Sequence, residues 1–125
     1  MNAHTMAQRA YSLDSAPIRT DRGTEYEVFA RITHRMKVAA QNCPGEFAKL
    51  ASAIHDNRQL WALLASDVAD TDNKLPNELR ARIFYLAEFT NSYSSKILTQ
   101  KASVEPLLEI NTAIMRGLRN GGGTV

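Results

Sequence analysis

The chain has 125 residues, with 15 basic and 13 acidic side chains and a formal net charge of +2. The apolar fraction of 44% and the charged fraction of 22% are those of a soluble globular protein, which excludes disorder over most of the length. The charge is nearly balanced, and the concentrated basic face that is usual in a dedicated nucleic-acid binder does not stand out in the sequence. We expect a single domain over residues 1–125.

Three features indicate a cytoplasmic protein. The chain has one cysteine, Cys43, so the fold does not depend on an intramolecular disulfide. No apolar run approaches the roughly 20 residues that a membrane span requires. The first eleven residues mix charged and polar side chains with alanines and lack the apolar core of a signal peptide.

Residues 1–20 predict a short helix followed by a loop. Residues 3–13 are rich in alanine, and the loop that follows contains Pro17. The helix would carry an apolar stripe at helical spacing, formed by Met6, Ala7, Ala10 and Tyr11.

The next two segments predict long helices at residues 21–41 and 44–69. In the first, Phe29, Ile32, Met36 and Ala39 recur at three- and four-residue steps and so share one face. The second has a near-heptad pattern typical of a bundle seam, with a polar interruption at 55–57 that could permit a kink. Its stripe consists of Phe47, Leu50, Ile54, Trp61, Leu64 and Val68.

Two further helices are predicted at residues 76–100 and 103–119, before a flexible tail at 120–125. Ser103 is the expected N-cap of the last helix. The first of these helices has one face made of Leu79, Ile83, Leu86, Thr90, Tyr93 and Ile97. The second is lined by Leu107, Ile110, Ile114 and Leu118 and flanked by Leu108 and Met115.

These elements predict an all-α fold. Alternating β-branched runs and hairpin-turn signals are absent from the sequence. Because short connections favour antiparallel neighbours, we expect an antiparallel helical bundle of four to five helices with short loops.

No residue constellation indicates an enzyme, a cofactor or a metal site. The sequence has no phosphate-binding glycine motif, and His4, His34 and His55 lie in different segments without metal-ligand spacing. A lone free cysteine such as Cys43 is more often a packing residue than a reactive thiol. An acidic run at a helix end lacks the glycine and distal glutamate of a calcium loop: Asp67, Asp70 and Asp72.

Aromatic and aliphatic side chains are the candidates for binding a partner protein. Trp61 fits either a core position or an interface anchor, and its place in the seam favours the core. The helix predicted at residues 76–100 is apolar on most sides. Such a helix is either central in its bundle or presents a face to a partner. The candidate partner-binding residues are Trp61, Tyr85, Phe89, Tyr93, Leu107, Ile114 and Met115.

Several motifs in this order resemble the FlaF family of flagellar biosynthesis regulators, over nearly the whole chain. They are Ala7-x-x-Ala10-Tyr11, Arg22-x-x-Glu25-x-Glu27 before Phe29-Ala30-Arg31-Ile32-Thr33, Asn57-Arg58-x-Leu60-Trp61, Asn73-x-Leu75-Pro76-x-x-Leu79-Arg80, and Ile110-Asn111-x-Ala113-Ile114-Met115-Arg116-Gly117-Leu118.

The resemblance implies a non-catalytic protein that promotes flagellin synthesis and filament assembly. It implies action after transcription, opposed to the regulator FlbT, and binding of flagellin as an export chaperone. A helical bundle with surplus apolar surface suits the capture of an amphipathic flagellin helix. The alternatives are direct action on the flagellin message through the arginines at 19–37, and an adaptor role between FlbT and flagellin.

Overall fold

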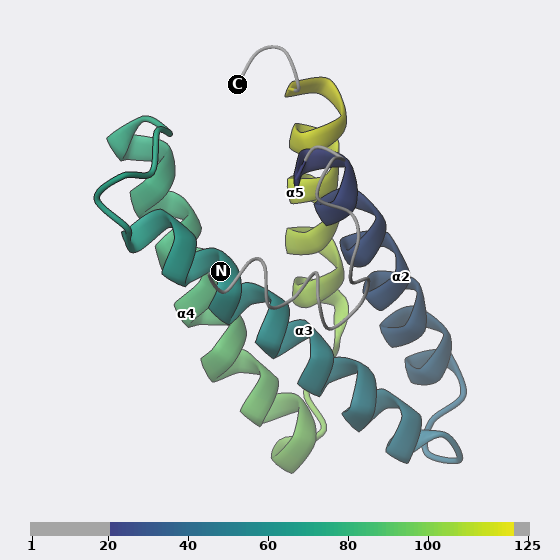
Figure 1. The fold of residues 1–125 in the computed structure, drawn as a ribbon. Helices are drawn as coiled ribbons and strands as arrows, with labels where there is room; N and C mark the ends of the chain where they lie inside the picture. The colour runs from purple at the N-terminus through teal and green to yellow at the C-terminus, as the bar shows by residue number, and fades with distance from the viewer. Residues whose placement is uncertain (1–20, 122–125) are drawn as a thin grey trace.

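The computed structural model describes residues 21–121, and it describes side chains for residues 26–117. The described residues form four α-helices: α2 (Asp21–Gln41), α3 (Phe47–Ala69), α4 (Asn77–Gln100) and α5 (Glu105–Gly121) (Figure 1). An all-α bundle is therefore confirmed. The helix expected at residues 3–13 lies outside the described residues.

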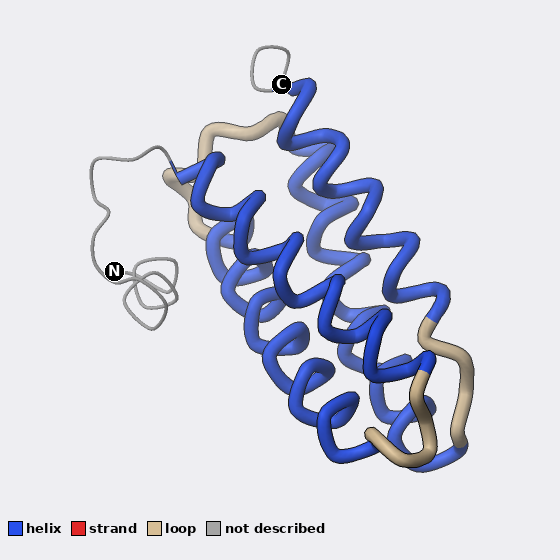
Figure 2. The backbone as a smooth tube through the Cα atoms, turned by 90° about the vertical axis from the view of Figure 1, so that its right-hand side faces the viewer, coloured by secondary structure: helices blue, strands red, loops and turns tan. Residues whose placement is uncertain are grey.

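The helices pack in the spatial order α4, α3, α2, α5. Seen from one side they run alongside one another (Figure 2), whereas Figure 1 shows the α3–α4 pair diverging from the α2–α5 pair towards the top of the view. Helices α4 and α5, although joined by residues 101–104 alone, do not pack along their lengths. Short loops therefore join helices that pack together at the α2–α3 and α3–α4 connections but not at this one. Leu107 of α5 is fully buried in the core, and α5 packs along α2.

The helix boundaries differ from expectation where turns precede the helices. Helix α3 begins at Phe47 rather than at residue 44, because the backbone of residues 42–46 forms turns, with Glu46 N–H donating to the Asn42 carbonyl. Helix α5 begins at Glu105, whose N–H is capped by the Ser103 hydroxyl at 3.0 Å. Helix α5 extends to Gly121, two residues beyond the predicted end at residue 119.

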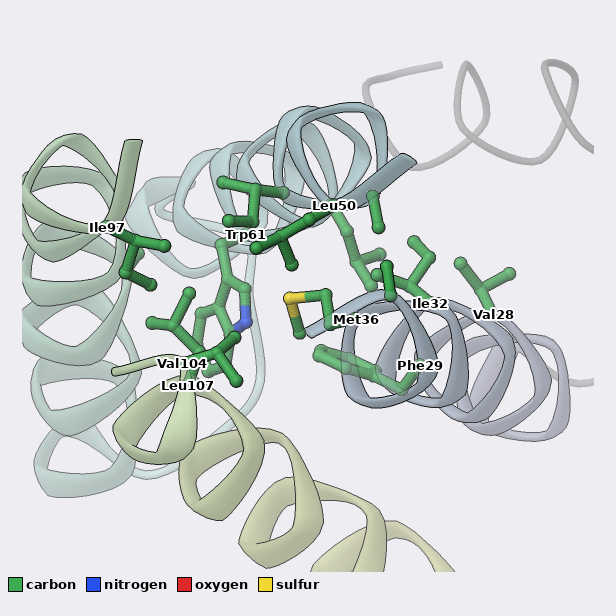
Figure 3. Close-up of a cluster of buried hydrophobic side chains, with 14 of the residues drawn as sticks. Val28, Phe29, Ile32, Met36, Leu50, Trp61, Ile97, Val104 and Leu107 are labelled. Carbon is green, nitrogen blue, oxygen red and sulfur yellow. The ribbon is translucent and has the colours of Figure 1, made fainter. Parts of the chain in front are cut away.

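The core takes buried apolar side chains from all four described helices. The stripe predicted on α2 is confirmed, because all four of its residues, from Phe29 to Ala39, are buried. Figure 3 shows apolar side chains from several helices gathered around Trp61, among them Met36 and Leu107. Of the seam predicted on α3, Phe47 lies outside the core with 41% of its surface exposed.

The polar interruption at residues 55–57 lies inside helix α3, which is continuous through this stretch. Asp56 forms a 2.7 Å ion pair with Arg35 of α2. Asn57 is fully buried, and its side-chain oxygen accepts a hydrogen bond from Asn111 of α5. The polar side chains of this stretch thus contact neighbouring helices.

Candidate partner-binding surface

A buried polar centre joins α2, α3 and α5. The indole N–H of Trp61 donates to Asn111 Oδ1 at 2.9 Å. The amide nitrogen of Asn111 donates to Asn57 Oδ1 at 2.8 Å and to Thr33 Oγ1 at 3.0 Å. Because an unpaired polar group in a dry core is costly, these bonds are formed together in one relative placement of the three helices.

Trp61 is a core residue in this arrangement. Its ring is 1% exposed and meets Phe29 edge-on, with ring centroids 5.6 Å apart. Leu107 is likewise fully buried. Both were expected among the partner-binding candidates, but neither side chain reaches the surface, because α2, α3 and α5 close over them.

Sequence reasoning overlooked the asparagines of this centre. Asn57 follows Ile54 by three residues, and Asn111 follows Leu107 by four, so each occupies a position on an apolar stripe. A polar residue at such a position is enclosed together with the stripe and requires a partner there. The position of each asparagine on an apolar stripe was therefore the signal in the sequence that could have identified it as a buried residue.

Two arginines tie α3 to α4. Arg58 donates to the carbonyl of Asn91 and to the hydroxyl of Ser95, each at 2.6 Å. Arg80 donates to the carbonyls of Val68 and Asp70 at 2.8 and 2.9 Å, which caps the last turn of α3.

The joint between α3 and α4 is also held by an asparagine. Asn73 donates to the Asp67 carbonyl at 3.0 Å and accepts the N–H of Leu75 at 2.9 Å. Together with the arginine contacts, these bonds give the Asn-Arg and Asn-x-Leu-Pro motifs a structural role within the bundle.

Helix α4 presents an aromatic surface away from α3. Its inner side carries Ile83, Thr90 and Ser94, which are buried. Tyr85 lies two residues after Ile83, about 200° further around the helix, and is 64% exposed. The side chains on the inner side of α4 are mostly small, whereas those on its outer side are aromatic. The exposed apolar surface of α4 therefore lies on the outside of the bundle.

We call Tyr85, Phe89 and Tyr93 the aromatic line; they follow one another at four-residue steps along α4. The rings of Phe89 and Tyr93 stack with centroids 5.4 Å apart and planes 13° from parallel. The Tyr93 hydroxyl donates to the carbonyl of Ser103 at 2.7 Å. One end of the line is therefore fixed to the loop before α5, and Tyr85 is its exposed end.

Phe84 gives α4 a second exposed apolar side chain. It is 41% exposed and precedes Tyr85, so it lies about 100° around the helix from it, off the aromatic line. The two residues therefore mark two different edges of α4.

The remaining candidates lie on α5. Ile114 and Met115 are half-buried and pack against the edge of the core. Helix α5 packs along α2, so these two residues lie on a different helix pair from the aromatic line of α4. The structure thus divides the seven predicted residues into two enclosed ones, three on α4 and two on α5.

The described residues hold no cluster of three side chains that could bind a metal ion. The acidic run at the end of α3 is a turn in which Asp70 Oδ1 accepts the N–H of Asp72 at 2.8 Å. Cys43 is exposed at the turn after α2, and its thiol donates to the Ala39 carbonyl at 3.3 Å. Within residues 21–121, no helix has the length and apolar character that crossing a membrane requires.

A shallow hollow of about 270 Å³ lies between α2 and α3. Its walls mix charged and apolar side chains, among them His34, Val38 and Lys49. Arg35, also in the wall, is held by Asp56 and by the Ser52 hydroxyl at 3.3 Å. The basic groups here are partly neutralised, so the hollow does not form an anion site.

Comparison with known proteins identifies the family of the chain. Neither the curated proteins nor the solved structures give a match. The family model described as flagellar protein FlaF matches residues 7–118, a range that includes the polar centre, the α3–α4 joint and the aromatic line. The chain belongs to the FlaF family of flagellar proteins.

Proposed function

We propose that this FlaF-family protein binds flagellin, holds an amphipathic terminal helix of it against α4, and so promotes flagellin export and filament assembly. The observation that carries the proposal is the aromatic line, whose outer end, Tyr85, is 64% exposed on a bundle with a well-filled core. Phe89 and Tyr93 behind it are half-buried, and a row of aromatic side chains with an exposed end fits the apolar face of an amphipathic helix, which presents anchors at three- and four-residue steps.

The chemistry of the surface favours burial of apolar area over ionic contact. Glu78, Arg82, Glu88 and Lys96 are exposed on α4, so both signs of charge are present along the helix. Such a mixed rim keeps a partner helix in solution until its apolar face docks, and it contributes little affinity itself.

The test is a calorimetric titration of the purified protein with synthetic peptides of the flagellin N- and C-terminal segments. We expect Tyr85→Asp to weaken binding about tenfold, because it places a charge at the exposed end of the aromatic line, within the docked apolar face. Phe84→Asp is the matched control: it makes the same change one residue away, on the other edge of α4, and we expect a much smaller loss. Equal losses in the two variants, or none, would exclude the aromatic line as the binding surface.

Direct action on the flagellin message is the second candidate. Arg31 and Lys37 are exposed on α2, but Arg35 between them is paired with Asp56. Arg19 and Arg22 lie outside the residues whose side chains are described. RNA binding through these groups should weaken steeply with salt, whereas apolar docking should tolerate it.

Co-purification from cells with and without flagellin separates the two candidates. A flagellin complex that survives high salt supports the chaperone role. RNA that is retained at low salt and lost at high salt supports message binding, and capture of FlbT with flagellin supports the adaptor role.

A further inference from the structure

A basic side chain lies at each end of the aromatic line. Arg82 comes three residues before Tyr85, and Lys96 comes three residues after Tyr93. With Phe89 between the two tyrosines, the five residues follow one another at steps of three, four, four and three, so they share one side of α4. We call these five residues the docking row. Its two basic ends are about 21 Å apart along the helix axis.

The two basic groups of the docking row are not used by the fold. Arg82 and Lys96 are exposed, and neither side chain has a hydrogen bond or ion pair with another residue whose side chain is described. By contrast, Arg35, Arg58 and Arg80 each bind a neighbouring helix. A free cation at each end of an apolar surface attracts an acidic group on a partner and repels a basic one.

The acidic residues of α4 do not neutralise the docking row. Glu88 comes one residue before Phe89, so it lies about 100° around the helix from that ring. Glu78 lies one turn before Arg82, beyond the end of the row, and the two form no ion pair among the described side chains. The row is therefore apolar in its middle and basic at both ends.

We propose that the helix docked on α4 carries acidic side chains at two positions about fourteen residues apart, with its apolar anchors between them, and that Arg82 and Lys96 select it by charge. This selection rests on the proposed docking of a flagellin helix at the aromatic line. The steps of the docking row are the same read from either end, so the two charges select the composition of the helix rather than its direction.

The charges act on selectivity more than on affinity. Exposed ion pairs are screened by solvent and add little to binding, in keeping with the mixed rim of α4. A helix with basic groups at the same two positions is repelled at both ends, so the difference between the two helices exceeds the gain from the favourable pairs. With both ends contributing, we expect about a tenfold difference in affinity.

A calorimetric titration at low salt with two synthetic helical peptides tests the selection. The peptides share one apolar face and differ only at two positions fourteen residues apart, where one has Glu and the other has Lys. We expect the protein to bind the Glu peptide about tenfold more tightly, and the variant Arg82→Glu/Lys96→Glu to prefer the Lys peptide. Both preferences should shrink as salt is added, because the pairs are exposed.

The matched control makes the same change of net charge on another helix. Arg31 and Lys37 are exposed on α2, so Arg31→Glu/Lys37→Glu should keep the preference for the Glu peptide. Equal affinity of the unaltered protein for the two peptides, or a reversal in the control as large as in the α4 variant, overturns the charge selection. Equal binding of both peptides removes the selection alone and leaves the docking supported. Binding of neither peptide refutes the docking at the aromatic line as well.

Discussion

The polar centre and the aromatic line use their aromatic side chains in opposite ways. In the centre, Trp61 is enclosed, meets Phe29 edge-on and donates its one polar hydrogen to Asn111. On α4, Tyr85 is 64% exposed. An aromatic residue in a family motif is therefore not by that fact a binding residue, because enclosure and hydrogen bonding decide which role it takes.

The difference extends to the motifs as a whole. Asn57, Arg58, Asn73, Arg80 and Asn111 all make hydrogen bonds that hold helices to one another. The family signature is thus largely a signature of the fold. The aromatic line lies outside the motifs that carry the resemblance, so the surface that we propose for partner binding is separate from these motif residues.

The largest effect should come from removing the hub of the polar centre. Asn111→Leu leaves the Trp61 indole N–H and the Asn57 carbonyl oxygen without their partner in a dry core. We expect the free energy of unfolding to fall by about 3 kcal/mol, measured by urea denaturation. Thr112→Leu, an exposed neighbour on α5, is the control and should change stability by less than about 0.5 kcal/mol. Equal values for the two would show that the centre does not hold α5.

Trp61→Phe tests whether Trp61 is a core residue or an anchor for a partner protein. The smaller ring keeps part of the packing against Phe29 but removes the donor to Asn111, so unfolding should cost about 2 kcal/mol less. Affinity for the flagellin peptides should be unchanged when measured on folded protein. A large loss of affinity at full folding would place Trp61 in the binding surface after all.

Arg80→Met tests whether the α3–α4 joint is structural. The substitution keeps much of the apolar stem but removes the bonds to the carbonyls of Val68 and Asp70, and we expect a loss of about 1 kcal/mol in thermal or chemical denaturation. Arg82→Met, an exposed arginine two residues on, should lose almost nothing. If both variants behave alike, the cap contributes no stability.

The smallest effect belongs to the pair formed by Arg35 and Asp56. Their side chains are 38% and 33% exposed, so solvent screens the pair. A double-mutant cycle with Arg35→Gln and Asp56→Asn should give a coupling of about 0.5 kcal/mol that shrinks with added salt. A coupling several times larger would mean that α2 and α3 depend on this contact as much as on the polar centre.

Much of the bundle follows from apolar spacing. The stripe from Phe29 to Ala39 and the face of α4 around Ile83 both contact the core, because side chains three and four residues apart share one side of a helix. Spacing also locates Tyr85 on the side of α4 away from the core. For these elements, local periodicity and tertiary packing agree.

The spacing of apolar residues does not determine which helices pack against each other or which partners the polar side chains contact. The return of α5 to α2 depends on Leu107 and Asn111 entering the centre, a tertiary event that loop length does not report. The partners of Asp56 and Asn57 in the bundle are Arg35 and Asn111, which are distant in sequence from residues 55–57. Burial of Trp61 likewise depends on the closure of three helices over it.

The most direct test of the central claim measures folding and binding on the same two variants. In Tyr85→Asp we expect flagellin-peptide affinity to fall about tenfold while the free energy of unfolding changes by less than about 0.5 kcal/mol. In Asn111→Leu, studied where it remains folded, we expect the reverse: lower stability and unchanged affinity. Parallel losses of affinity and stability in both variants would contradict the separation of the fold residues from the partner surface.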